Sequence, residues 1–110
     1  MVTNVVVMGG YESERLTSTE ILDVATMTWT TGPNLPVGAY DNRGVTSRGG
    51  PYLGFSIGGN CQHSNRRCHE IFGLKETSQN VYTWEELHRM KFARAAVAAV
   101  NAPKSILPNC

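Results

Sequence analysis

The stretch Val5-Val6-Val7-Met8-Gly9-Gly10 decides the fold, because a second apolar segment ends in the same way 49 residues later. That segment is Tyr52-Leu53-Gly54-Phe55-Ser56-Ile57-Gly58-Gly59. Each is a short, β-prone run closed by two glycines, the residue type that most readily adopts positive φ where a strand ends. The recurrence predicts two copies of one supersecondary unit.

Two further landmarks follow each glycine pair in the same order. Glu20-Ile21-Leu22 is matched by Glu70-Ile71-Phe72 at a spacing of 50 residues, and Trp29 is matched by Trp84 at a spacing of 55. The change from 50 to 55 predicts a five-residue insertion between Phe72 and Trp84. The constant order of these landmarks supports a repeat of about 50 residues, the length of four short strands with their loops.

None of the segments between turn residues carries a sustained helical stripe of apolar residues. Strands are expected at residues 5–8, 20–24, 28–31, 44–47, 52–57, 69–74, 81–87 and 95–100. The last of these is rich in alanine, which favours a helix by propensity. The repeat frame nevertheless predicts a strand there, opening a third unit. The sequence therefore predicts an all-β sandwich, barrel or propeller, and the period favours a propeller.

Composition narrows the possible partners. The chain has 110 residues, suited to one domain, with 10 Lys and Arg against 9 Asp and Glu and a formal net charge of +1. This balance argues against nucleic acid or an anionic membrane as the main partner. No run approaches the length of a membrane span. The first residues lack the cationic start of a secretory signal, and this leaves the compartment undetermined.

The motif order resembles a kelch repeat: an apolar strand with Gly-Gly, then Glu-Ile-Leu-Asp, then Trp, then Gly-Pro-Asn-Leu-Pro. The matching positions are Gly9, Gly10, Leu22, Asp23 and Trp29 in the first unit, and Gly58, Gly59, Phe72 and Trp84 in the second. Gly73 stands where the family has Asp. The resemblance implies kelch-type β-propeller blades, each a four-stranded antiparallel sheet, with both tryptophans in alike surroundings between blades.

The same resemblance divides the chain into parts. Residues 1–50 form the first kelch repeat, which starts at the second strand of its blade and ends with the first strand of the next. Residues 51–101 form the second repeat and the start of a third, and 102–110 form a C-terminal tail. A propeller closes with about 4–8 blades, and this chain supplies about two. We therefore expect a fragment whose neighbours are the remaining blades of a longer chain.

Two alternatives to a fragment stay open. The chain can assemble with other copies of itself, or it can be a truncated gene product. For residues 95–100 there is also an alternative to the start of a third unit, in which they are the strand that completes a ring formed upstream.

The segment 61–69 holds the residues with the most chemistry: Cys61, Cys68, two histidines and two arginines. A disulfide between the two cysteines, two free thiols, and a zinc site are the alternatives. The spacing matches no familiar zinc finger, and Arg66 and Arg67 would place positive charge beside a metal. A disulfide would imply an oxidising compartment. We expect no metal and no cofactor.

Loops that join second to third strands open on the same face as loops that join one blade to the next. In the kelch family this face commonly docks a protein or peptide. The contact candidates that the resemblance implies are Tyr11, Arg15, Tyr40, His63, Arg66, Arg67 and Arg94. Arginine and tyrosine are enriched at binding hot spots. The alternative is that each is an ordinary solvated loop residue.

Motifs for catalysis are missing from the sequence, which has no phosphate loop, nucleophile elbow or His-Glu-x-x-His. We therefore expect a non-catalytic interaction module. Longer relatives often serve as substrate-recognition parts of cullin-based ubiquitin ligases, beside a BTB domain. The competing hypothesis is a blade pair of a secreted or galactose-oxidase-like propeller. A copper site of that kind needs convergent His and Tyr ligands, and His63, His69 and His88 do not recur at equivalent positions.

Overall fold

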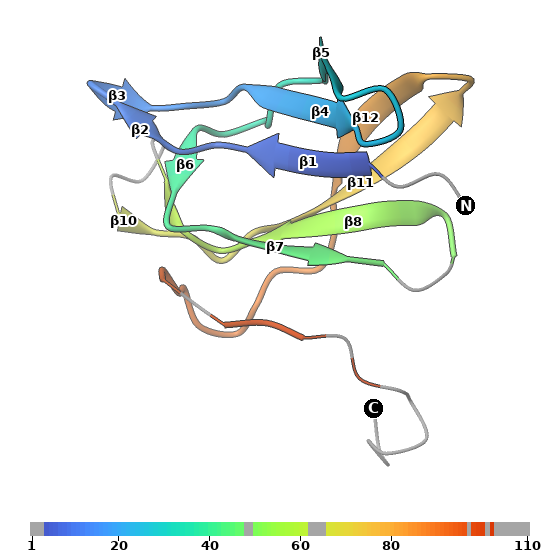
Figure 1. Ribbon diagram of the computed structural model, residues 1–110. Helices are drawn as coiled ribbons and strands as arrows, with labels where there is room; N and C mark the ends of the chain where they lie inside the picture. Colours follow the sequence, from blue (N-terminus) through green and yellow to red (C-terminus); the bar gives the residue numbers. More distant parts are fainter. Residues whose placement is uncertain (1–3, 48–49, 62–65, 97, 101, 103–110) are drawn as a thin grey trace.

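The computed structural model describes residues 4–47, 50–61, 66–96, 98–100 and 102. These residues form antiparallel strands joined by turns and irregular connections, and no helix occurs among them (Figure 1). Within this part of the chain, no helix has the length and hydropathy that crossing a membrane requires. The predicted all-β class is therefore correct, although no sheet that the described residues form closes into a ring.

The first sheet has three strands in the order β1-β4-β5. They are β1 (Asn4–Met8), β4 (Thr19–Asp23) and β5 (Thr28–Thr31). The turn before β5 is held by Asp23, whose carboxylate accepts a hydrogen bond from the Ala25 backbone N–H at 2.9 Å. Along β4, Thr19 and Ile21 are buried while Glu20 is exposed. This alternation shows that one face of the first sheet is covered.

The second sheet has four strands in the order β12-β11-β8-β7. They are β7 (Arg43–Thr46), β8 (Tyr52–Ile57), β11 (Ile71–Ser78) and β12 (Val81–Glu86). Every pair is antiparallel. The sheet turns Phe72, Leu74 and Trp84 toward the first sheet, where they form the main core with Leu35. The two sheets lie one above the other in Figure 1.

Five two-residue strands lie together at one end of the two sheets (Figure 1), and one of them, β6, belongs to the connection between the sheets. They are β2 (Tyr11–Glu12), β3 (Glu14–Arg15), β6 (Ala39–Tyr40), β9 (Asn60–Cys61) and β10 (Arg66–Arg67). β2 and β3 form a hairpin, and the order β10-β9-β6 joins a loop of the second sheet to the connection between the sheets.

The same six backbone hydrogen bonds occur around both glycine pairs. In the first part they run, donor first, from Gly9 to Ser18, Gly10 to Ala39, Leu16 to Gly10, Gly32 to Thr19, Leu35 to Thr17 and Ala39 to Leu16. In the second part they run from Gly58 to Glu70, Gly59 to Arg94, Cys68 to Gly59, Leu87 to Ile71, Met90 to His69 and Arg94 to Cys68. Equivalent residues are 49 positions apart at the glycine pairs, 52 positions apart at β4 and β11, and 55 positions apart from the tryptophans onward.

Strand register corrects the predicted insertion. Leu22 lies opposite Trp29, and Leu74 lies opposite Trp84, so the equivalent of Leu22 is Leu74 rather than Phe72. Three extra residues fall in the loop before Cys68, and three fall in the hairpin before Trp84. The single five-residue insertion was wrong because the Glu-Ile match reflects strand composition and not register.

The two tryptophans hold equivalent register positions but differ in burial. Trp84 is 8% exposed, and its indole N–H donates to the Pro33 carbonyl at 3.0 Å and to Thr19 Oγ1 at 3.2 Å. Trp29 is 50% exposed. The expectation of alike surroundings was therefore wrong. The physical reason is that Trp84 faces the first sheet in the main core, whereas Trp29 lies on a half-exposed face of the first sheet.

The alanine-rich end of the chain is the other departure from expectation. Residues 95, 96 and 98–100 form no strand. Arg94 makes an isolated bridge to Cys68, and the Ala96 N–H donates to the Asp41 carbonyl at 2.9 Å. The predicted strand at 95–100 was wrong for these residues. The first strand of a sheet is stable only beside a second strand, and the described part of the chain supplies none there.

Candidate functional site

The candidate site is the end of the molecule where the short strands meet. The Gly10 N–H donates to the Ala39 carbonyl at 2.8 Å, and the Ala39 N–H donates to the Leu16 carbonyl at 3.2 Å. Ala39 also lies opposite Cys61 in the β6–β9 pair. The loops between second and third strands and the connection between the sheets therefore lie at one end.

Three of the sequence-derived candidates form a cluster at this end. The Tyr11 and Tyr40 rings meet edge to face, with their centroids 5.3 Å apart. The Arg15 guanidinium lies 5.5 Å from the centre of the Tyr40 ring, within cation–π range. Arg15 also donates to Asn60 Oδ1 from Nε at 2.9 Å and from Nη2 at 2.6 Å. We name Tyr11, Arg15, Tyr40 and Asn60 the loop cluster.

Two cross-strand pairs build the loop cluster. Tyr11 lies opposite Arg15 in the β2–β3 hairpin, and Tyr40 lies opposite Asn60 in the β6–β9 pair. Directly opposed residues project to the same side of a sheet, so each pair presents its side chains together. The tight hairpin turns at Ser13, which has a φ of 64°. The cluster therefore results from pairing in two small sheets that the long strands position.

Asn60 is the member that the sequence did not indicate. It lies 45 residues from Arg15, and only the pairing of β9 with β6 brings them together. A weak signal was present, because Asn60 directly follows Gly59 and so stands at the point where the chain leaves β8. Its carbonyl oxygen accepts two hydrogen bonds from the guanidinium that also lies over the Tyr40 ring.

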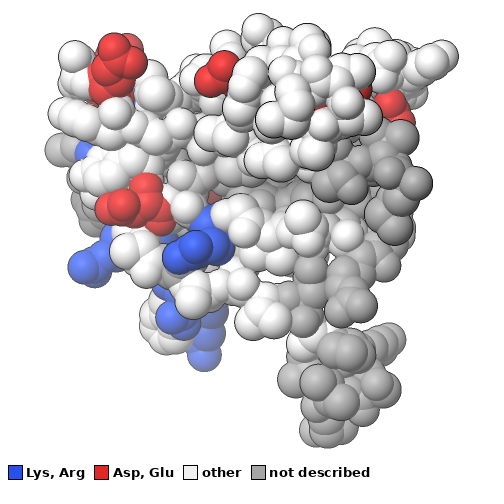
Figure 2. Space-filling view, in the orientation of Figure 1, with Lys and Arg blue, Asp and Glu red and all other residues white. Residues whose placement is uncertain are grey.

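The other candidates lie around the cluster or outside the described residues. Arg67 is exposed in β10, where it lies opposite Asn60, and Arg94 is exposed beside its bridge to Cys68. Arg66 takes part in β10 through its backbone. His63 lies outside the described residues. Figure 2 shows Lys and Arg side chains gathered at this end of the molecule, with Asp or Glu side chains beside them.

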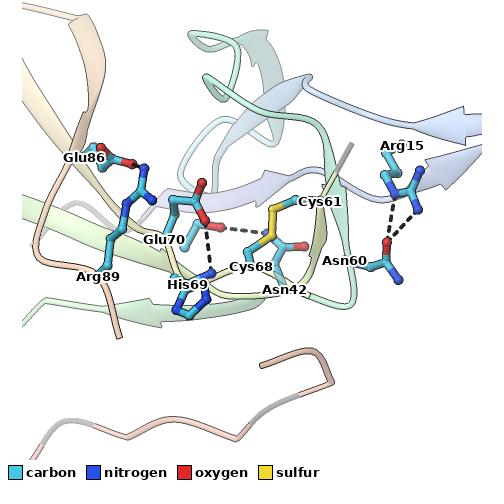
Figure 3. The surroundings of a disulfide bond; sticks show 10 residues. Arg15, Asn42, Asn60, Cys61, Cys68, His69, Glu70, Glu86 and Arg89 are labelled. Carbon is cyan, nitrogen blue, oxygen red and sulfur yellow. Dashed lines mark hydrogen bonds and ion pairs between the residues drawn. A yellow bond between two sulfur atoms is a disulfide. The ribbon is translucent and has the colours of Figure 1, made fainter. Parts of the chain in front are cut away.

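The structure joins Cys61 and Cys68 in a disulfide (Figure 3). Their Cα atoms are 5.6 Å apart, and both residues are 1% exposed. The bond ties β9 to the residue that follows β10, in the segment that carries Asn60. Of the three alternatives for this segment, the structure contains the disulfide, and one of its cysteines directly follows Asn60 of the loop cluster.

A buried carboxylate lies beside this disulfide. One carboxylate oxygen of Glu70 and the two sulfur atoms lie within 4.8 Å of one another. With the sulfurs bonded together, no thiolate is available to a metal. Glu70 instead accepts a hydrogen bond from the His69 backbone N–H at 3.0 Å, and the pair is visible in Figure 3. This hydrogen bond links the buried carboxylate to the backbone directly after Cys68.

The glycine pairs are structural. Gly9 has a φ of 71°, and a Cβ there would lie 2.6 Å from the Ala39 carbonyl oxygen. Gly58 has a φ of 61°, and a Cβ there would lie 2.5 Å from the Arg94 carbonyl oxygen. Both positions therefore need glycine for conformation and for close approach of the next connection. They therefore help to position the strands that carry the loop cluster.

A cavity of about 660 Å³ opens between the two sheets. Its lining includes Val6, Leu74 and Tyr82, with few polar groups. Ligand sites of this size usually combine apolar walls with a few convergent polar groups that orient the ligand. This cavity lacks the second feature, so the loop cluster is the better candidate for recognition.

No protein-family model matches this chain, and no curated protein matches its sequence. Its functional interpretation therefore rests on its own motifs and geometry.

Proposed function

We propose that this protein is a non-catalytic interaction module of the kelch propeller type, which binds a protein or peptide partner through the loop cluster. Two observations support the propeller type. The backbone hydrogen bonds around Gly9 and Gly58 are the same, and the two sheets pack face to face through Trp84. Units that stack in this manner are typical of propeller blades.

The observation that carries the binding proposal is the fixed geometry of Arg15. Asn60 and Tyr40 hold its guanidinium, while the neighbouring Tyr11 is 63% exposed. A surface whose side chains are already ordered loses less conformational entropy when it binds. Tyrosine and arginine are also the residue types that dominate binding energy at interfaces. The loop cluster therefore has the composition and the order of a recognition surface.

The arginines at this end would suit an acidic partner segment. Arg67 and Arg94 are exposed there, and Glu12 and Glu14 of the β2–β3 hairpin are exposed beside Tyr11 and Arg15, so that Figure 2 shows both signs of charge at this end. Arginine binds carboxylates through two parallel hydrogen bonds, a geometry that also gives specificity. A peptide with one aromatic or aliphatic residue next to Asp or Glu would match this surface. Substrate recognition for a ubiquitin ligase is one family-level form of this role.

One observation favours a second candidate. The Cys61–Cys68 disulfide is of the kind that persists in oxidising compartments. It favours a blade pair of a secreted propeller, the competing hypothesis from the sequence. Binding through the loop cluster would be the same in both settings. An oxidase-like metal centre gains no support from it.

A peptide selection tests the proposed function. The oxidised protein would be used to select displayed random peptides, and the affinity of the selected peptides would be measured by calorimetry. We expect the substitutions Tyr11→Ala and Tyr40→Ala to weaken binding about tenfold or more, as for hot-spot residues. Lys75→Ala and Thr26→Ala, away from the loop end, are the controls. Equal affinity in all four variants, or a selection without binders, would overturn the proposal.

A further inference from the structure

The edge strand of the first sheet lacks the neighbour that its counterpart has. In the second sheet, β8 lies between β7 and β11. The equivalent strand β1 pairs with β4 on one side, and its other edge has no partner among the described residues. An unpaired edge presents a row of backbone N–H and C=O groups that can accept another strand. The first sheet is therefore one strand short of the second.

One face of the first sheet is also uncovered. Val5 is 44% exposed, Val7 is 47% exposed and Trp29 is 50% exposed. Trp84 occupies the place of Trp29 in the second sheet, and there the same face is packed against the first sheet. The structure thus shows what covers this type of face, which is the opposite face of a sheet of the same kind.

Residues 98–100 are the counterpart of β7. Asp41 has a φ of 58° and Ala96, 55 residues later, has a φ of 53°, so both connections turn alike. A Cβ on Gly44 would lie 3.5 Å from Met8, and Ala99 lines a cavity together with Ile57, the equivalent of Met8. Val100 is 85% exposed. The segment runs past the second sheet on the side away from β1 (Figure 1).

We propose that a second copy of this chain covers both surfaces, head to tail. Residues 98–100 of one copy would add as an antiparallel strand to the free edge of β1 in the next copy. The β7–β8 register gives the pairing, with Ala98 opposite Met8, Ala99 opposite Val7 and Val100 opposite Val6. Strand addition of this kind supplies main-chain hydrogen bonds to both chains.

The outer face of the second sheet offers a matching binding position for Trp29 of the next copy, near His88 and Ile71. The Leu87 N–H donates to the Ile71 carbonyl, as the Gly32 N–H does to the Thr19 carbonyl. His88 therefore stands where Pro33 stands, and its carbonyl can accept the indole N–H of Trp29. Ile71 replaces Thr19 and offers apolar contact in place of a hydroxyl. The His88 carbonyl is the one hydrogen-bond acceptor that a single indole N–H needs.

A second copy is the occupant because one molecule carries both halves of the contact. The uncovered face with β1 and Trp29 is at one end of the stack, and residues 98–100 with the outer face of the second sheet are at the other. Such a head-to-tail contact closes into a ring when its rotation permits. Propellers close with about 4–8 blades, so a ring of two-blade chains would hold about two to four copies.

Sedimentation velocity of the full chain over a range of concentrations tests this inference. We expect a reversible assembly that ends at a discrete size of about two to four copies, in line with the closure of propellers. Tryptophan emission should shift to shorter wavelength with assembly, because Trp29 becomes buried. A monomer at every concentration would overturn the proposal, whichever peptide the loop cluster binds.

Two variants block the two halves of the contact. Trp29→Ser removes the exposed indole, and the double variant Ala99→Pro with Val100→Pro removes backbone donors from the tail. We expect each variant alone to be a folded monomer, and an equal mixture to form a one-to-one dimer that grows no further. Met27→Ser, which removes another exposed apolar side chain, should assemble like the wild type. Assembly of either blocked variant alone at wild-type strength, or no dimer in the mixture, would contradict the proposal.

Discussion

The indole N–H of Trp84 donates to the carbonyl of Pro33 at 3.0 Å, across 51 residues of sequence and from one sheet to the other. The same N–H lies 3.2 Å from Thr19 Oγ1, and Thr19 is fully buried. One side chain thus fills the main core and satisfies polar groups at the boundary between the two sheets. Its equivalent Trp29 has neither role in a single chain.

Stability should separate the two tryptophans. Trp84→Ala removes a buried aromatic side chain and should lower the free energy of unfolding by about 3–5 kcal/mol. Trp29→Ala changes a half-exposed side chain and should stay within about 0.5 kcal/mol when measured on the monomer. Denaturant unfolding checks both. Equal losses would show that the packing between the sheets is not as described.

Two glycines with the same type of backbone conformation should differ in their tolerance of alanine. Gly50 has a φ of 75° and open space where a Cβ would lie, so Gly50→Ala should cost about 1–2 kcal/mol from the left-handed conformation alone. Gly58→Ala adds a contact of 2.5 Å with the Arg94 carbonyl oxygen. We expect a clearly larger loss of unfolding free energy for Gly58→Ala. The opposite order would contradict the close approach at this turn.

Removal of the disulfide should destabilise the loop end. The double substitution Cys61→Ser with Cys68→Ser opens a short loop, and loop-closure entropy gives a loss of about 2–3 kcal/mol. Because β9 carries Asn60, affinity for selected peptides should fall as well. Thermal unfolding and calorimetry measure the two effects. Cys110→Ser, which removes the remaining cysteine, is the matched control and should leave both unchanged.

The phenol of Tyr52 should titrate late. Its hydroxyl donates to Glu85 Oε1 at 2.7 Å, and this hydrogen bond, then desolvation and then the charge of Glu85, raises the pKa of Tyr52 above 10.0. The folded pKa is above the unfolded one. The contribution of the neutral phenol to stability is therefore fully present below about pH 10 and is lost as pH rises through the folded pKa.

The absorbance of the phenolate, followed as a function of pH, tests the direction of the pKa shift of Tyr52. Glu85→Gln should lower the pKa of Tyr52, and Tyr52→Phe should remove the contribution of this phenol from the titration. The Tyr52→Phe control is needed because burial, followed by Glu76, also raises the pKa of Tyr82. A Glu85→Gln variant that titrates like the wild type would contradict the hydrogen bond.

The local part of the fold could be predicted from the sequence. Strands were expected at 5–8, 28–31 and 52–57, and β1, β5 and β8 cover these residues. The reason is that β-branched and aromatic runs closed by glycine pairs are local signals. Register was not predictable from the Glu-Ile match, because the equivalence of Leu22 and Leu74 is set by the cross-strand pairs Leu22–Trp29 and Leu74–Trp84, in hairpins of different length.

The candidate site could also be predicted from the sequence only in part. Tyr11, Arg15 and Tyr40 were identified as loop residues of one face, and the structure brings them together. Asn60 was missed because its partner Arg15 is 45 residues away. Thr19 gave no signal as a buried acceptor, since a threonine in a strand ordinarily packs on a half-exposed surface.

Hydrogen exchange of the two indole N–H groups, followed by NMR in the monomeric Ala99→Pro and Val100→Pro variant, tests the packing of one sheet on the other most directly. We expect one slowly exchanging indole, which disappears in Trp84→Phe, and one rapidly exchanging indole, which disappears in Trp29→Phe. Two indoles that exchange at the same rate, or a slow signal that belongs to Trp29, would contradict the account.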